Sequence, residues 1–238
     1  MTDKNTQASV SFLRHEGWVG PNDFTDWIHI IGCGAVGSHM ALAAAKMGAH
    51  KFVLWDVDRV ESHNLSNQAF DVEHVGQTKV AALAAVLQRF NPLIEVVKHP
   101  YFFESSKHKE LLEGPVVIAT DTMKARKDIY TAVKMNSKVQ GVFEVRLGFD
   151  YGEVHAFDNI NLKECKDWYE SLMDDSEIPD GPCNLRICTT LVLLSSAMAV
   201  HTLCNRYAAL RQQVPWKYKR RVFLSLTDQL YVRSVDSN

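Results

Sequence analysis

A glycine-rich motif between a predicted strand and a predicted helix constrains the fold of this chain most. Gly32, Gly34 and Gly37 form the pattern Gly-x-Gly-x-x-Gly. The segment 29–31 before the motif is predicted to be a short buried strand, and 35–47 after it to be a helix. Glycines let the backbone approach a phosphate closely, and the free amide groups at a helix N-terminus favour an anion. The motif therefore predicts a nucleotide-binding turn of the Rossmann type.

Strands and helices alternate along the first 141 residues of the 238-residue chain. This alternation is typical of a parallel sheet that helices cover on both faces. Gly48 stands where the first helix should end, because glycine readily adopts the left-handed conformation of a C-terminal cap. The predicted strands lie at 29–31, 51–55, 94–99, 116–119 and near Val139, and the predicted helices at 35–47, 78–90 and 124–135.

The pattern changes after residue 141. The stretch 160–184 is acidic and contains prolines and a glycine, so we predict a long irregular loop there. A long apolar helix is expected from Thr189 onward. The fold class is therefore α/β, a Rossmann-like and mostly parallel sheet with helices on both faces, plus antiparallel strands in the C-terminal part. Alternating apolar residues place those later strands at 143–147, 153–157, 222–226 and 230–235.

A carboxylate stands where a bound ribose would need one. Asp56 comes 19 residues after Gly37, at the end of the second predicted strand. A carboxylate at that position accepts hydrogen bonds from ribose hydroxyls in Rossmann folds. The strand, the glycine motif, the helix and Asp56 follow one another in the order and spacing of a Rossmann fold, and this favours nucleotide binding. At this point NAD and ATP are equally allowed.

Four further motifs, three after the second strand and one after the fourth, distinguish ATP from NAD as the expected nucleotide. In their order they resemble those of the ThiF/MoeB family of ubiquitin-activating-like adenylyltransferases, which carries D-x-D-x-V, N-L-x-R-Q, G-x-x-K and a strand ending in T-D. The resemblance runs from about Ile28 to Asp121, and more loosely through the helix after Thr189. In this chain the motifs read D-x-D-x-V at 56–60, N-L-x-N-Q at 64–68, G-x-x-K at 76–79 and T-D at 120–121.

The resemblance implies a role for each matching residue. Asp56 would bind the ribose, Asn64 would lie near the triphosphate, Lys79 would neutralise phosphate charge, and Asp121 would bind Mg²⁺ with the pyrophosphate. These roles meet a physical demand, because a carboxylate that attacks the α-phosphate must overcome the repulsion between two anions. Mg²⁺ prefers hard oxygen ligands. The remaining nucleotide-binding candidates are Gly32, Gly34, Gly37, Asp58 and Asn67.

The resemblance also implies an activity and an organisation. It implies ATP-dependent adenylation of a carboxylate, at the C-terminus of a small ubiquitin-like or sulfur-carrier protein, with ATP and Mg²⁺ as cofactors. It implies an N-terminal extension at 1–27, one Rossmann-like adenylation domain at 28–238, and a crossover loop at 160–188 within it. A homodimer is expected for the same reason.

One position departs from the family pattern. Asn67 stands where the family has the arginine of N-L-x-R-Q. Asparagine can donate a hydrogen bond, but it carries no charge and lacks the guanidinium fork. Three explanations stay open: a variant subgroup, an arginine supplied from elsewhere, or a weakened enzyme. Arg14 is a candidate for an arginine that reaches a neighbouring subunit's ATP site, and Arg59 and Arg126 are further candidates.

The cysteines are candidates for a nucleophile that would accept the activated acyl group. The family often uses a cysteine on the crossover loop, and Cys183 lies there, near Arg186, which would favour a thiolate. Cys188 borders the apolar helix and is expected in the core. Cys33 and Cys204 are expected to be packing residues. No Cys-x-x-Cys pair occurs, so we predict no structural zinc.

Composition narrows the kinds of partner and cellular location that are possible for this protein. A net charge of −2 argues against a nucleic-acid partner and against an anionic membrane surface. No export signal is read at the N-terminus, and a cytoplasmic location is expected. The apolar stretch 191–210 contains serine, histidine, asparagine and arginine, so it reads as a core helix rather than a membrane span. Two alternative functions stay open: a non-catalytic nucleotide-binding subunit and an NAD-dependent oxidoreductase.

Overall fold

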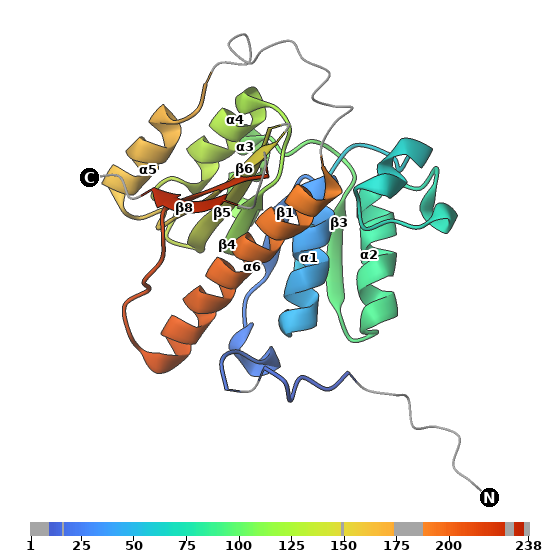
Figure 1. Cartoon of the computed structure of the whole chain (residues 1–238), viewed down its shortest axis with the longest axis horizontal. Helices are drawn as coiled ribbons and strands as arrows, with labels where there is room; N and C mark the ends of the chain where they lie inside the picture. The colour runs from blue at the N-terminus through green and yellow to red at the C-terminus, as the bar shows by residue number, and fades with distance from the viewer. Residues whose placement is uncertain (1–9, 16, 149, 174–187, 227–230, 236–238) are drawn as a thin grey trace, which may run out of the picture.

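The chain folds around one eight-stranded sheet. The computed structural model describes residues 10–15, 17–148, 150–173, 188–226 and 231–235. Within these residues the strand order is β3-β2-β1-β4-β5-β6-β7-β8 (Figure 1). Neighbours from β3 to β5 are parallel, and neighbours from β5 to β8 are antiparallel. The strands are β1 (Ile28–Ile31), β2 (Lys51–Trp55), β3 (Glu95–His99), β4 (Gly114–Ile118), β5 (Val139–Leu147), β6 (Tyr151–Phe157), β7 (Arg221–Ser225) and β8 (Tyr231–Val235).

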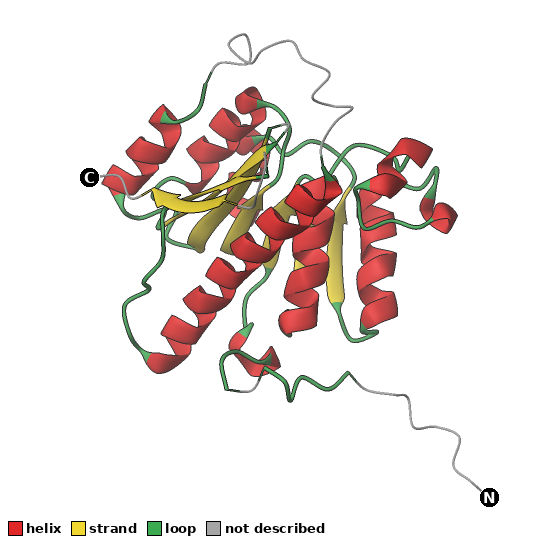
Figure 2. Cartoon of the chain, viewed as in Figure 1, coloured by secondary structure: helices red, strands yellow, loops and turns green. Residues whose placement is uncertain are grey.

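Helices cover both faces of the sheet (Figure 2). On one face α1, α2 and α6 share a core with the strands, and on the other face α4 and α5 pack against a second core. The predicted fold class is therefore confirmed. The helices are α1 (Ala35–Met47), α2 (Lys79–Phe90), α3 (Ser105–His108), α4 (Met123–Val133), α5 (Leu162–Glu170) and α6 (Thr189–Gln212), with short 3-10 turns η1 (Pro21–Asp23), η2 (Ser62–Ser66), η3 (Val72–His74) and η4 (Lys109–Leu111).

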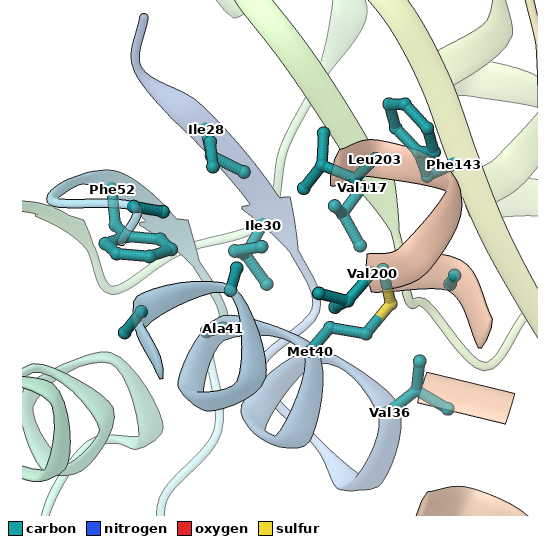
Figure 3. Packing of buried hydrophobic residues seen from close by; sticks show 14 of the residues in the cluster. Ile28, Ile30, Val36, Met40, Ala41, Phe52, Val117, Phe143, Val200 and Leu203 are labelled. Atoms are coloured by element: carbon teal, nitrogen blue, oxygen red, sulfur yellow. The ribbon is translucent and has the colours of Figure 1, made fainter. Parts of the chain in front are cut away.

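The larger core fixes the glycine motif to the sheet. Ile28 and Ile30 of β1 belong to the same buried cluster as Met40 and Ala41 of α1 and Val200 of α6 (Figure 3). All five are buried. Burial of each large aliphatic side chain is worth roughly 1.5–3 kcal/mol relative to exposure. The strand before the turn and the helix after it are therefore anchored in the same core.

Several boundaries follow the sequence predictions. Gly48 has φ +114° and caps α1, as predicted. β5 is one continuous strand, where the sequence predicted a strand near Val139 and a separate one at 143–147. The predicted C-terminal hairpin is present, because β7 and β8 pair antiparallel. The division into an extension at 1–27 and one domain at 28–238 stays a prediction.

The predicted irregular loop at 160–184 is wrong in its first part. Helix α5 begins after Asn161, whose side chain accepts hydrogen bonds from the backbone amides of Lys163 and Glu164. Cys165 and Trp168 lie three residues apart and are both buried, so one face of the helix packs on the sheet. Residues 174–187 lie outside the described part of the chain.

Helix α6 is the longest helix of the described residues. No described helix combines the length and the apolar composition that crossing a membrane requires.

Candidate nucleotide-binding site

Three segments with polar or glycine residues meet at one edge of the sheet. Ile31, the last residue of β1, pairs with Trp55 of β2 and with Ile118 of β4, and all three strands are parallel. The glycine motif follows β1, Asp56 follows β2, and Asp121 follows β4. The two carboxylates therefore lie at the carboxyl ends of the strands that flank β1, as predicted from the sequence. In parallel α/β sheets this edge holds the ligand crevice.

The glycine motif forms a tight cradle at that edge. Gly32 has φ +97°, and a Cβ atom there would lie 2.4 Å from the carbonyl oxygen of Ala119. A Cβ atom on Gly37 would lie 1.9 Å from the carbonyl oxygen of Gly32. Only glycine fits at these two positions, so the start of α1 lies directly against the loop. The loop runs directly into the N-terminus of α1, where no side chain caps the helix and the first backbone amides favour an anion.

Asp56 is tied to the glycine loop. One carboxylate oxygen accepts a hydrogen bond from the Cys33 amide at 2.7 Å, and the other from the Asp58 amide at 2.8 Å. Burial raises the pKa of Asp56, although the charge of Lys79 and these two amides oppose that rise. Each oxygen keeps capacity for a further hydrogen bond, so the carboxylate can hold the loop and accept a ribose hydroxyl.

Lys79 brings a buried positive charge to this edge. Its Nζ lies 2.8 Å from Oδ2 of Asp58, and only 11% of its side chain is exposed. Burial lowers the pKa of the Lys79 amine, but the carboxylates of Asp58 and Asp56 outweigh burial and the pKa is raised. Lys79 is therefore a cation in the folded protein. It interacts electrostatically with Asp56 and Cys33, which places its charge beside the glycine loop.

The segment with Asn64 and Asn67 is anchored to two helices. Thr189 at the start of α6 donates to the carbonyl of Ser66 at 2.9 Å, and Ser38 of α1 accepts from the Ala69 amide at 3.0 Å. Asn64 is buried, and its side-chain oxygen accepts from the Glu61 amide at 2.9 Å. Part of the Asn64 side chain therefore caps its own turn, a role that the sequence motif does not reveal.

Three buried polar atoms around the glycine motif have no hydrogen-bond partner among the described residues. They are Nε2 of His39, Oε1 of Gln68 and Oγ1 of Thr120. Buried polar atoms in folded proteins are nearly always paired, with protein, water or ligand. The first lies on α1, the second follows η2 and the third follows β4. These positions are consistent with a polar ligand beside the loop. The Asp121 carboxylate is exposed and offers oxygen atoms, the kind of ligand that Mg²⁺ prefers.

Arg126 proves not to be a free phosphate ligand. It is 6% exposed, and its guanidinium donates to the carbonyl of Thr120 and to the buried Glu144. Arg126 is therefore no substitute for the missing arginine at position 67. Its placement could have been inferred from spacing, because it lies one turn after Thr122, the N-cap of α4, and helical side chains point back toward the N-terminus.

The cysteines divide into buried and exposed thiols. Cys33 and Cys204 are buried, as expected, and burial raises the pKa of Cys204 to about 12. Cys188 is exposed at the N-cap of α6, so its predicted place in the core is wrong. The Thr190 hydroxyl and the first backbone amides of the helix lower the pKa of Cys188. The candidate Cys183 and its neighbour Arg186 lie outside the described residues, and Arg14 is exposed.

Comparison with known proteins gives relatives that match part of the chain. The chain is 39% identical over 74 residues to "Ubiquitin-like modifier-activating enzyme 5" of Drosophila melanogaster, covering 31% of this chain and 18% of that protein. It is 29% identical over 148 residues to the Gallus gallus protein of that name, covering 56% and 37%. It is 33% identical over 91 residues to "Adenylyltransferase and sulfurtransferase MOCS3" of Mus musculus, covering 38% and 20%. The matches thus span well under half the length of these relatives.

Solved structures share the fold. The chain superposes on E. coli MccB, crystallised with AMPCPP and MccA, with a TM-score of 0.70 and 17% identity, covering 91% of this chain and 65% of MccB. It superposes on PaaA with a TM-score of 0.68 and 16% identity, covering 90% of this chain and 74% of PaaA. At this identity the likeness shows the fold alone.

A protein-family comparison covers most of the chain. The model of the ThiF family matches residues 25–210, which include the glycine motif, Asp56, Lys79 and Asp121. The chain belongs to the ThiF family.

Proposed function

We propose that this protein is an ATP-dependent adenylyltransferase that activates a carboxylate as an acyl-adenylate. The substrate class we propose is the C-terminus of a small ubiquitin-like or sulfur-carrier protein. The names of the relatives support this class, since they are a ubiquitin-like modifier-activating enzyme and an adenylyltransferase and sulfurtransferase. The observation that carries the proposal is the buried cation of Lys79 beside the glycine loop, at the same edge as Asp56 and Asp121.

Each residue would contribute one physical effect to the reaction. A substrate carboxylate oxygen attacks the α-phosphorus of ATP, the bond from that phosphorus to the bridging oxygen breaks, and pyrophosphate leaves. Asp56 would orient the ribose, and the amides at the start of α1 would bind the phosphates. Lys79 would exchange its contact with Asp58 for phosphate oxygens and so reduce repulsion between the two anions. Asp121 would hold Mg²⁺, which supplies positive charge to the departing pyrophosphate.

Mass spectrometry tests this proposal directly. The protein is incubated with Mg²⁺-ATP and the small proteins encoded beside its gene, and each intact mass is measured. We expect one small protein to gain the mass of one adenylyl group, which is AMP less one water, and we expect no gain with Asp121→Ala, because the proposed metal ligand is lost. Absence of any AMP adduct, together with intact ATP binding, would instead support the non-catalytic nucleotide-binding subunit that Asn67 suggests.

A thioester step at Cys183 is the second part of the proposal. A thiolate attacks the acyl carbon of the adenylate, a thioester forms, and AMP leaves. Cys183→Ala should keep the AMP adduct of the small protein but lose any adduct on the enzyme that a reducing agent releases. Cys188→Ala is the matched control, because Cys188 is an exposed thiol in the same region with a lowered pKa. A reducible adduct that survives Cys183→Ala and disappears in Cys188→Ala would move the acceptor to Cys188.

Two further features belong to the proposal. We expect a homodimer in which Arg14 of one subunit supplies charge to the ATP site of the other, in place of the arginine missing at position 67. We also expect a cytoplasmic location.

A further inference from the structure

The turn between β4 and α4 has an unusual support. Arg126 of α4 turns back and donates from both Nε and Nη2 to one acceptor, the backbone carbonyl of Thr120. Its remaining Nη1 donates to Oε1 of Glu144 at 2.7 Å. The guanidinium is thereby committed to one backbone carbonyl and one carboxylate, in surroundings where Arg126 is 6% exposed.

Glu144 of β5 is the centre of a buried charge network. It is fully buried and accepts hydrogen bonds from Arg126, from Arg146 and, at 2.6 Å, from Nε1 of Trp168. Burial alone would raise the pKa of Glu144, but Arg126 and Arg146 outweigh burial and hold it at about 2. Glu144 is therefore an anion that fixes the direction of the Arg126 guanidinium.

Asp121 lies between two fixed neighbours. The carbonyl of Thr120, on one side, is held by Arg126. Thr122, on the other side, caps α4 by accepting a hydrogen bond from the Ala125 amide at 3.2 Å. The Asp121 side chain itself is exposed at the carboxyl edge of the sheet. An exposed carboxylate on a backbone fixed on both sides is preorganised to bind an ion.

We propose that Arg126 and Glu144 are positioning residues, which fix the Thr120–Asp121 turn so that the Asp121 carboxylate is aimed at a divalent cation. This inference rests on the proposed function, in which Asp121 holds Mg²⁺ with the nucleotide. A buried ion pair is often no more stabilising than apolar residues of the same size. The contribution of this pair is instead geometric, because two charged N–H groups fix one carbonyl next to the metal ligand.

Arg146 offers a matched control for Arg126. Arg146 is 9% exposed and pairs with the same Glu144, but its Nη1 donates to the carbonyl of Ser171 after α5 at 2.9 Å, far along the chain from Asp121. Arg126→Lys and Arg146→Lys keep the charge and lose the guanidinium fork. The two variants therefore disturb the same network, and only Arg126→Lys releases the turn.

The experiment measures ATP affinity of the full chain by calorimetry at a series of free Mg²⁺ concentrations, together with the melting temperature. The free Mg²⁺ concentration that produces half of the Mg²⁺-dependent change in ATP affinity is the quantity compared. We expect Arg126→Lys to raise this concentration about tenfold, as for other groups that orient metal ligands. ATP affinity without Mg²⁺ should stay unchanged. Arg146→Lys should lower the melting temperature similarly but leave the Mg²⁺ dependence at the wild-type value.

Equal Mg²⁺ dependence in wild type and Arg126→Lys, or equal shifts in both lysine variants, would overturn the inference and leave a purely structural network. If Arg126→Lys does not fold, Glu144→Gln takes its place, because it keeps the shape and removes the charge that orients Arg126. A Mg²⁺ dependence unchanged by Glu144→Gln would overturn the inference as well. If the wild type binds no ATP at any Mg²⁺ concentration, it is the proposed function that fails.

Discussion

At the scale of single residues, the proposed phosphate ligand Lys79 is paired with Asp58, whose Oδ2 lies 2.8 Å from its Nζ. Asp56 is predicted by its spacing after the glycine motif, and Lys79 and Asp121 are predicted by the resemblance of their motifs to the family pattern. The pairing of Lys79 with Asp58 was not predicted, because it depends on a return of the chain that local sequence does not specify. That return is made by backbone hydrogen bonds from the Gly76 amide to the Val60 carbonyl and from the Val60 amide to the Gln77 carbonyl.

The burial of His29 predicts that the free energy of unfolding depends on pH. It is 1% exposed, and its Nδ1 accepts a hydrogen bond from Nε1 of Trp55 at 3.3 Å. Burial, together with the nearby His99, lowers the pKa of His29 to about 3 from the ordinary 6.5. The folded protein therefore keeps His29 neutral, while the unfolded chain protonates it below pH 6.5. The stability this provides is complete above pH 6.5 and is lost as the pH falls.

Urea unfolding at pH 7.0 and at lower pH measures this effect. Between about pH 6 and 5 we expect the free energy of unfolding to fall by about 1.2 kcal/mol for this one histidine, because most of the unfolded chains bind a proton there that the folded protein does not. His29→Gln should flatten the decrease in that range, since glutamine offers an acceptor to Trp55 and does not titrate. A wild-type unfolding free energy that stays constant from pH 7 to 5 would contradict the assignment.

At the scale of elements, long periodic segments were predictable and α5 was not. Its acidic composition suggested a solvated loop, whereas the structure compensates the acidic side chains locally. Lys163 pairs with Asp167 and Lys166 with Glu170, each four residues apart along the helix. The burial of Trp168 supplies the tertiary contact that a short helix needs to be stable.

The N-cap of α5 gives a prediction about stability. The Asn161 side chain accepts two backbone amides at the helix start, at 3.1 and 3.3 Å. Asn161→Ala should lower the free energy of unfolding by about 1 kcal/mol, as for other N-cap residues. The matched control is Asn22→Ala, at an exposed position, which should change it by less than about 0.5 kcal/mol. Chemical denaturation measures the free energy of unfolding of both variants. An equal decrease in the two variants would contradict the capping role of Asn161.

At the scale of the whole molecule, the sequence predicts a parallel sheet but not its strand order. β1 pairs with β4 although two strands, β2 and β3, and three helices, α1, α2 and α3, lie between them in the sequence, and this non-local pairing has no signal in local periodicity. The pairing matters for the site, because it brings Asp121 to the same edge as Asp56. The match of motif order to a known family is what made that edge predictable.

Oligomeric state is testable at this scale. We expect sedimentation at micromolar concentration to show a dimer of the 26.9 kDa chain. This expectation rests on the family resemblance, because the exposed Leu193 and Leu210 of α6 lie 17 residues apart and do not form one apolar patch. A monomer at that concentration would remove both the dimer and the proposed role of Arg14.

Calorimetric titration with ATP and with NAD tests whether ATP binds at the carboxyl edge of β1, β2 and β4 through Lys79. The wild type should bind ATP and not NAD. Lys79→Ala should weaken ATP binding roughly ten- to a hundredfold, since a charge-assisted hydrogen bond is worth about 1.5–3 kcal/mol. Lys51→Ala is the matched control, because Lys51 lies at the opposite end of β2, and it should bind ATP like the wild type. Unchanged ATP affinity in Lys79→Ala, or binding of NAD in place of ATP, would contradict the account.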